Sequence, residues 1–155
     1  MSDEGVVDFV VVAFRHGGRW RVESVPRRLG NDLDATVTVL RERAGGDGFA
    51  FISVDEDFFV ALRLAGADTR WLLSDVTAAT DWPVARDVLD RLVLPLPDED
   101  DRVQPAGDVT IFADLGVDPM SVAAICDDLD SYPDEMLARI ADLAGFGPEF
   151  DDVLP

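Results

Sequence analysis

The chain has 155 residues, 48% of them hydrophobic, which is enough for a folded core and fits one domain or one domain with a small appendage. Its 32 acidic residues outnumber 13 basic ones, all arginine, and the resulting net charge of −19 argues against binding to phosphate backbones. No run of about 18 apolar residues predicts a membrane span. A single cysteine, Cys126, excludes an internal disulfide, so we expect a cytoplasmic protein.

The first half of the chain has the patterns of antiparallel strands. A β-branched and aromatic run at 6–14 predicts a strand that is buried on both faces. After the Gly17-Gly18 turn signal, Trp20–Val25 predicts its hairpin partner. Asn31-Asp32 then predicts the cap of a helix over 33–40, which Gly45–Gly48 ends.

Three further strands are predicted in quick succession, at 49–54, 58–64 and 69–74, and the first connection, 55–57, is acidic. Pro83 predicts the start of a second helix, because proline suits the first helical turn. The result is an α+β fold with an antiparallel five-stranded sheet in ββ-α-βββ-α order. That order matches, as a fold analogy, the profilin-like group that includes roadblock and longin domains.

The sequence predicts three segments: a sheet domain (1–92), an acidic proline-containing linker (93–107) and a small acidic helical module (108–155). The linker joins Leu94-Pro95-Leu96-Pro97 to Asp98-Glu99-Asp100-Asp101, a composition that favours an extended backbone. Residues 98–155 carry 16 acids against two arginines, a net charge of −14, whereas residues 1–97 carry 16 acids against 11 arginines, a net charge of −5.

Helical periodicity replaces the strand pattern in the third segment. Asp108 is predicted to cap a helix over 109–115, and Asp118-Pro119 to begin one that continues through Leu129. Pro133 is predicted to begin another, and residues 150–154 a last turn. The expected apolar stripe of the helix after Pro133 is Met136, Leu137, Ile140, Leu143 and Ala144.

The residues that chemistry requires are few. A zinc site needs clustered ligands, but His16 and Cys126 are the only residues of their kinds and lie far apart in the sequence. Neither GxxxxGK[ST] nor GxGxxG occurs, and the acidic string that begins at Asp128 lacks the glycine of a calcium loop. We therefore predict no catalytic residue, no cofactor and no metal site. An uncharacterised carboxylate-dependent enzyme stays open as an alternative.

Two surface segments are candidates for binding another protein. Residues 74–83 form a long connection between a strand and a helix, and long ordered loops often bind. Residues 127–135 place five carboxylates around a helix–helix corner, which would suit a basic surface. The predicted partner-binding residues are Asp75, Asp81, Trp82, Asp127, Asp128, Asp130, Tyr132, Asp134 and Glu135. Solvation in a saline habitat is the alternative explanation of the acidity, and a homodimer of roadblock type through a sheet edge is the alternative role.

Several strings resemble a known family. In the first half they are Phe58–Val60, Leu72–Ala79, Asp81–Pro83 and Asp90–Leu92; in the second they are Val103–Asp108, Ile111–Gly116, Ile125–Asp130 and Tyr132–Leu137. Because of these strings, the chain resembles the tRNA adenosine deaminase-associated proteins of high-GC Gram-positive bacteria. The resemblance extends from about residue 7 to the end of the chain. The resemblance implies a deaminase as the protein partner and supplies no catalytic residue. The H-x-E and P-C-x-x-C motifs of the deaminase chemistry itself are absent from the sequence.

Overall fold

The computed structural model describes residues 7–154; Val6, the first residue of the predicted first strand, lies outside them. The strands are β1 (Val7–His16), β2 (Arg19–Val25), β3 (Asp47–Val54), β4 (Phe58–Ala65), β5 (Asp68–Leu73) and β6 (Ala106–Gly107). The α-helices are α1 (Leu33–Ala44), α2 (Pro83–Arg91), α3 (Pro119–Cys126), α4 (Pro133–Ala144) and α5 (Gly147–Val153). The short 3-10 helices of the described residues are η2 (Arg27–Asn31), η3 (Val76–Thr80) and η4 (Ala113–Leu115).

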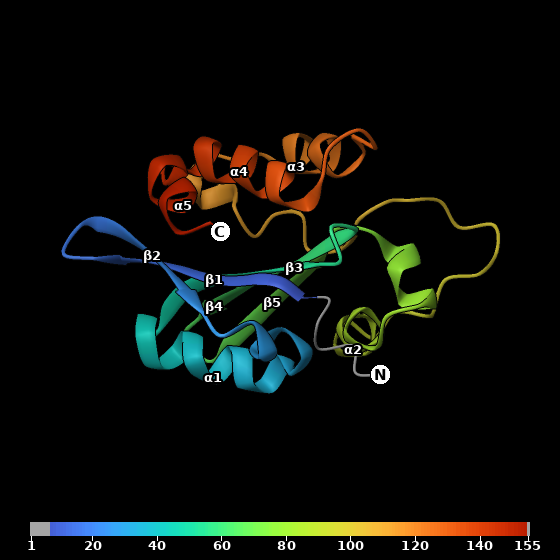
Figure 1. Cartoon of the computed structure of the whole chain (residues 1–155), viewed down its shortest axis with the longest axis horizontal. Coiled ribbons are helices and arrows are strands. Elements are labelled where there is room, and N and C mark those ends of the chain that lie inside the picture. The colour runs from blue at the N-terminus through green and yellow to red at the C-terminus, as the bar shows by residue number, and fades with distance from the viewer. Residues whose placement is uncertain (1–6, 155) are drawn as a thin grey trace.

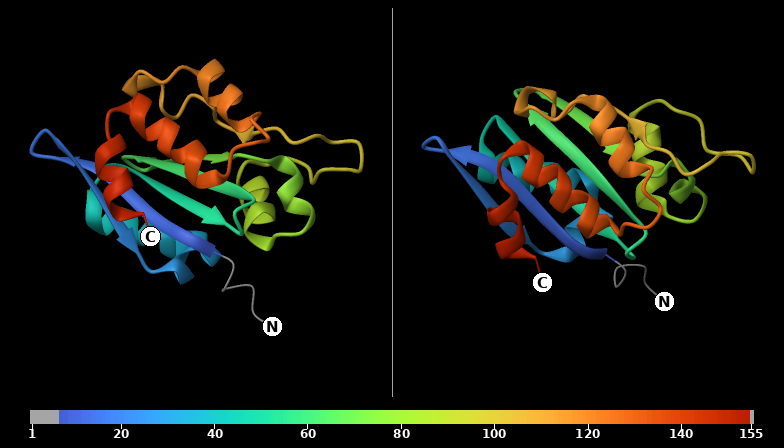
Figure 2. Two further views of the ribbon diagram at one scale, coloured as in Figure 1. Left: turned by 45° about the horizontal axis from the view of Figure 1, so that its top comes forward. Right: turned by 90° about the horizontal axis from the view of Figure 1, so that it is seen from above.

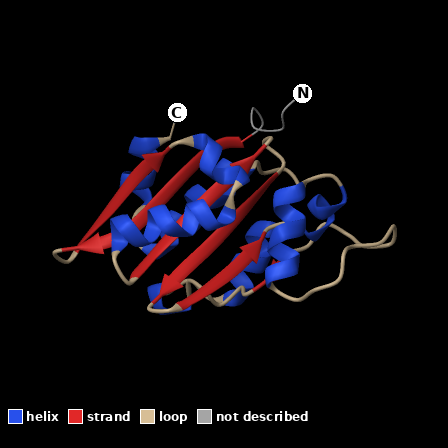
Figure 3. Cartoon of the chain, turned by 90° about the horizontal axis from the view of Figure 1, so that it is seen from below, coloured by secondary structure: helices blue, strands red, loops and turns tan. Residues whose placement is uncertain are grey.

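The strands form one antiparallel sheet in the order β2-β1-β3-β4-β5-β6 (Figure 3). The predicted α+β class and antiparallel sheet are confirmed, but the prediction of five strands is wrong. The sixth, β6, lies inside the predicted linker and pairs Ala106 with Leu73. Two residues are too short for an alternating pattern, so the sequence carries no periodic signal for this strand. Gly107 has a φ of +103°, and a Cβ there would lie 2.4 Å from the carbonyl oxygen of Trp71, so only glycine fits.

Helices cover both faces of the sheet. Successive side chains of a strand point to opposite faces, so one strand contributes to the clusters on both sides. In β1, Val10 and Val12 join the hydrophobic cluster under α1 and α2, whereas Phe9 and Val11 join the cluster under α3, α4 and α5. Figure 1 shows the two helical layers on opposite sides of the sheet. This two-sided burial explains the continuous apolar run of the first strand.

The C-terminal residues 108–154 supply one side of the second cluster. Phe112, Phe146 and Phe150 are fully buried there, against Phe49 and Phe51 of β3. Burying an aromatic side chain stabilises the fold by roughly 1.5–3 kcal/mol, so these contacts fix the helices on the sheet. The division of the chain at 92 and 107 stays a prediction.

The structure corrects three expectations for this region, two of them through local hydrogen bonds. The Asp108 carboxylate accepts from the amide of Thr110 at 2.9 Å in a turn, and helical geometry is limited to η4 instead of extending over 109–115. The next helix, α3, ends at Cys126 rather than continuing through Leu129, because the Asp128 carboxylate binds the amide of Asp130 at 3.1 Å and folds the chain into a turn. Leu143 is 53% exposed and does not belong to the buried stripe of α4.

Candidate functional site

An acidic cavity of about 380 Å³ lies at the end of the sheet where β3 turns into β4. It brings together the β3–β4 turn, the start of the loop after β5 and the corner between α3 and α4, three segments far apart in the sequence. We call these lining residues the acidic cavity: Glu56, Asp57, Ser74, Asp75, Val103, Cys126, Leu129, Asp130, Ser131, Tyr132 and Met136.

The β3–β4 turn is held in an unusual conformation. Asp55 and Glu56 have φ values of 52° and 48°, which few residues other than glycine adopt. The amide of Asp57 closes the turn on the carbonyl of Val54 at 2.9 Å, and the amide of Glu56 donates to the Asp8 carboxylate at 2.7 Å. The turn therefore holds three adjacent carboxylates in a defined place rather than on a loose loop.

Asp57 is a carboxylate of the β3–β4 turn whose surroundings raise its pKa. Partial burial raises its pKa, and the negative charges of Asp75 and Asp55, with a further contribution from Asp81, raise it more. The two predicted residues Asp75 and Asp81 thus lie within electrostatic reach of the β3–β4 turn. Crowded like charges destabilise the chain alone and attract a cation or a basic side chain.

The loop over 75–82 is ordered by its own contacts. Asp75 caps η3 by accepting from the amide of Thr77 at 2.9 Å, and the amide of Val76 donates to the carbonyl of Gln104 at 2.8 Å. Trp82 is partly buried and its ring lies 6.3 Å from that of Phe58. The indole of Trp82 therefore packs against the α2-side cluster more than it contributes to the surface.

The α3–α4 corner combines acids with exposed apolar side chains. Leu129 is 74% exposed and Tyr132 is 57% exposed, and both line the acidic cavity beside Asp130. Asp128 accepts from Ser131 and Arg139, and Glu135 accepts from the amide of Tyr132 at 2.8 Å, so these two carboxylates hold the corner together.

The nine predicted residues therefore divide into groups. Asp75, Asp130 and Tyr132 share the acidic cavity, and Asp134 lies with Tyr132 and Glu56 in a neighbouring cavity of about 400 Å³. Asp127 is exposed at the end of α3, outside both sets of lining residues. Sequence reasoning took Asp55–Asp57 only as turn residues and missed Val103 and Leu129. An apolar residue inside the acidic string 127–130 was the signal available for Leu129.

Cys126 is a buried residue that lines the acidic cavity. Burial raises the pKa of its thiol to about 12, with smaller contributions from the charges of Asp127 and Asp75. The thiol therefore stays protonated at neutral pH and is a poor nucleophile.

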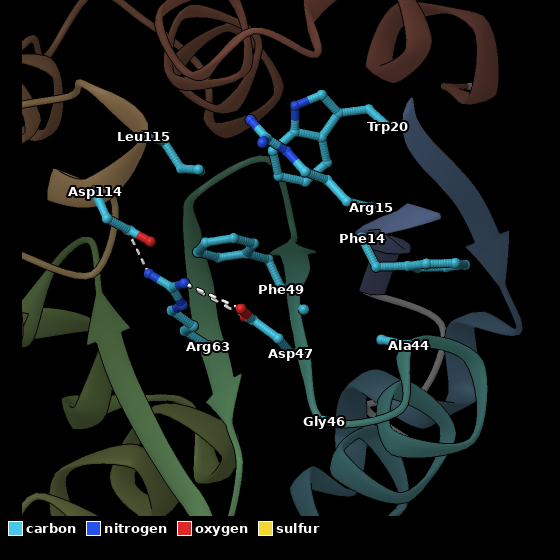
Figure 4. A pocket seen from close by; sticks show the side chains of 11 residues that line it. Phe14, Arg15, Trp20, Ala44, Gly46, Asp47, Phe49, Arg63, Asp114 and Leu115 are labelled. Carbon is cyan, nitrogen blue, oxygen red and sulfur yellow. Dashed lines mark hydrogen bonds and ion pairs between the residues drawn. The ribbon is translucent and has the colours of Figure 1, made fainter. Parts of the chain in front are cut away.

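A second cavity, of about 480 Å³, lies at the opposite end of the strands beside the β1–β2 hairpin (Figure 4). The buried Arg63 on β4 points between Asp47 and Asp114, and its Nη1 also donates to the carbonyl of Ile111 at 3.2 Å. Its guanidinium lies 4.9 Å from the centre of the Phe49 ring. Arg63 thus bonds to the two carboxylates that line this cavity and joins the sheet to the C-terminal segment. Sequence reasoning did not single out Arg63.

Residues 7–154 contain neither a metal-binding cluster nor a membrane-spanning helix. Within that range no three His, Cys, Asp or Glu side chains converge on a point that could hold a metal ion. Over the same range no helix has the length and apolarity to cross a membrane.

Fold and site together define a class: an α+β protein with a helix-covered antiparallel sheet and an acidic, partly apolar cavity at one sheet end. The chain belongs to the family described as Rv3753c-like tRNA adenosine deaminase-associated protein, whose model matches residues 8–147. It is 39% identical over 150 residues to Protein Rv3753c of Mycobacterium tuberculosis, and the aligned part covers 94% of this chain and 87% of that protein. These matches confirm the family resemblance. No solved structure matches the chain.

Proposed function

We propose that the chain is a non-catalytic accessory protein that binds a tRNA adenosine deaminase through the acidic cavity and its rim. The observation that carries this proposal is the pairing of exposed Leu129 and Tyr132 with the carboxylates of the same cavity. A protein interface typically has an apolar centre with a polar rim, and aromatic anchors are enriched in it. The family description supplies the identity of the partner.

The charge distribution supports the same partner chemistry. A deaminase that binds tRNA needs a basic surface, because binding to phosphates depends on Lys and Arg. The crowded carboxylates at the β3–β4 turn and the α3–α4 corner complement such a surface. The same charges repel RNA, so direct nucleic-acid binding is not part of the proposed role.

A matched pair of variants tests the proposal. Glu56→Gln with Asp130→Asn removes two charges from the acidic cavity, whereas Asp151→Asn with Asp152→Asn removes two from α5. Both double variants change the net charge equally, and only the position differs. We expect the purified deaminase to bind the wild type at low salt and to bind less as salt rises, since salt screens exposed charges.

The cavity variant should bind about tenfold more weakly, which corresponds to about 1.4 kcal/mol, and the α5 variant should bind like the wild type. Equal weakening by both variants would show that only net charge matters, and no binding of the wild type at either salt concentration would remove the deaminase as partner.

A homodimer through β2, an outer strand of the sheet, is the second candidate. An outer strand offers unpaired backbone groups to another strand. Light scattering on the purified chain separates the two roles: a monomer at high protein concentration contradicts the dimer and leaves deaminase binding intact.

A further inference from the structure

The connection from α2 to β6, residues 92–105, is a long ordered loop without helix or strand. In the views of Figures 1 and 2 it extends sideways from the body of the molecule. Structureless connections of this length within a compact domain are uncommon, and many of them bind a partner. We define its first part, residues 93–101, as the projecting segment.

The projecting segment exposes apolar side chains that neither core cluster uses. Val93 is 89% exposed, Leu94 42% and Leu96 61%, and none of the three belongs to the two hydrophobic clusters. A chain that only had to span this distance would gain solubility from polar residues at these positions. Leu94 and Leu96 are therefore accessible to a partner surface.

The backbone of this segment is preorganised for binding. Leu94 precedes Pro95 and Leu96 precedes Pro97, and a residue before proline is restricted to extended conformations. The direction of departure from α2 is set by the amides of Val93 and Leu94, which donate to the carbonyls of Asp90 and Leu89 at 3.1 and 2.9 Å. A preordered extended segment loses little conformational entropy when it binds.

Acidic residues follow the leucines directly, and their own hydrogen bonds keep them together. The Asp101 carboxylate accepts from the amide of Asp98 at 2.8 Å, and the Asp98 carboxylate accepts from the amide of Asp100 at 2.9 Å. Glu99 and Asp100 are exposed in this turn. The segment thus offers two leucines and then a compact cluster of negative charge.

The end of the loop returns to the surface proposed above. Val103 lines the acidic cavity, and the carbonyl of Gln104 accepts from the amide of Val76 in the loop after β5. The chain therefore reaches the acidic cavity at Val103, two residues beyond the end of the projecting segment.

We infer that the projecting segment inserts Leu94 and Leu96 into an apolar groove of the deaminase that Lys or Arg residues border, beside the contact made by the acidic cavity. This inference rests on the proposed function, because it names a second contact with the same partner. Charge complementarity selects a basic border, and the proline-fixed extended backbone selects a groove rather than a flat surface.

Equilibrium binding to the purified deaminase tests the inference with two double variants. Leu94→Ser with Leu96→Ser removes the two anchors, and Met120→Ser with Leu143→Ser removes two apolar side chains that are 83% and 53% exposed on α3 and α4. All four positions lie outside the core clusters, so both variants should keep the urea unfolding midpoint of the wild type.

We expect the loop variant to bind at least about tenfold more weakly, and the helix variant to stay within about twofold of the wild type. Equal affinities of the loop variant and the wild type would overturn the inference and leave the proposed function standing. Equal weakening by both variants would also overturn it. If the wild-type chain does not bind the deaminase at all, the proposed function and this inference fall together.

Discussion

Arg63 offers the sharpest test of how the two sides of the sheet are joined. Its side chain is only 11% exposed, and it bonds to Asp47 at the start of β3 and to Asp114 and Ile111 in the C-terminal segment. Asp114 raises the pKa of the guanidinium, and in return the hydrogen bond from Arg63 holds the pKa of Asp114 below its usual range. Replacement by methionine keeps an unbranched stem like the apolar part of the arginine side chain, and it removes the charge and the hydrogen bonds.

The expected cost follows from the separate contacts. Leaving the Ile111 carbonyl without this donor costs about 1–3 kcal/mol, and losing the cation–π contact with Phe49 costs about 0.5–2 kcal/mol. The carboxylates of Asp47 and Asp114 are 66% and 55% exposed, so water solvates them after the change and each ion pair contributes less than about 1 kcal/mol. The Nε atom of Arg63 is buried without a hydrogen-bond partner among the described residues. Removing this atom stabilises the fold by about 1 kcal/mol and offsets part of the cost of the substitution. We expect Arg63→Met to lower the free energy of unfolding by about 2–3 kcal/mol.

Urea unfolding followed by tryptophan fluorescence measures this cost. Arg70→Met is the control, because Arg70 also pairs with a carboxylate, Asp108, but its side chain is 36% exposed and the expected loss is below about 1 kcal/mol. The hydrogen bond from Arg63 to Asp114 stabilises the fold fully above the ordinary carboxyl pKa, and this stabilisation is lost as the pH falls through the lowered pKa of Asp114 in the folded state. The difference in the free energy of unfolding between Arg63→Met and the wild type should therefore shrink in acid. If Arg63→Met costs no more than Arg70→Met at neutral pH, Arg63 does not join the C-terminal segment to the sheet.

Two further predictions concern the acidic cavity. Asp57→Asn should raise the free energy of unfolding at pH 7 by about 0.5 kcal/mol, a value discounted for exposure, and the gain should vanish near pH 3. The folded-state pKa of Asp57 is raised, so its protonated form stabilises the fold below the ordinary pKa of 3.8 and this contribution is lost as the pH rises. Urea midpoints at the two pH values measure it, and an equal gain at both contradicts the charge crowding. Cys126 should react with a thiol-specific disulfide reagent at pH 8.5 only slowly in the folded chain and rapidly in urea, because burial raises its pKa to about 12; fast labelling of the folded chain would refute the buried, protonated thiol.

Local sequence patterns were enough to predict the class of the fold. The run at 6–14 indicated a strand buried on both faces, and β1 contributes to both clusters. Gly45 and Pro83 were correctly read as helix boundaries, since glycine and proline act through their own backbone geometry. These signals depend on residues close together in the sequence.

Two of the errors, the missed strand β6 and the exposed Leu143, share one cause. The pairing of β6 depends on contacts of residues 106–107 with β5, more than 30 positions earlier, and two residues carry no period. Leu143 fits an apolar helical stripe by spacing, but the sheet that would cover it lies on another side of α4. Position along a helix gives a face, and only the neighbours decide whether that face is buried.

By itself the sequence determined the acidity, the antiparallel α+β class and the shortage of nucleophiles and metal ligands, because these follow from composition and short-range periodicity. Only the tertiary structure decided that the β3–β4 turn, Asp75 and the α3–α4 corner share one cavity, and that Arg63 lies buried between the sheet and the C-terminal segment. Such meetings bring together residues that are distant in the sequence, 48 positions apart for Arg63 and Ile111 and 51 for Arg63 and Asp114, and short-range patterns do not record them.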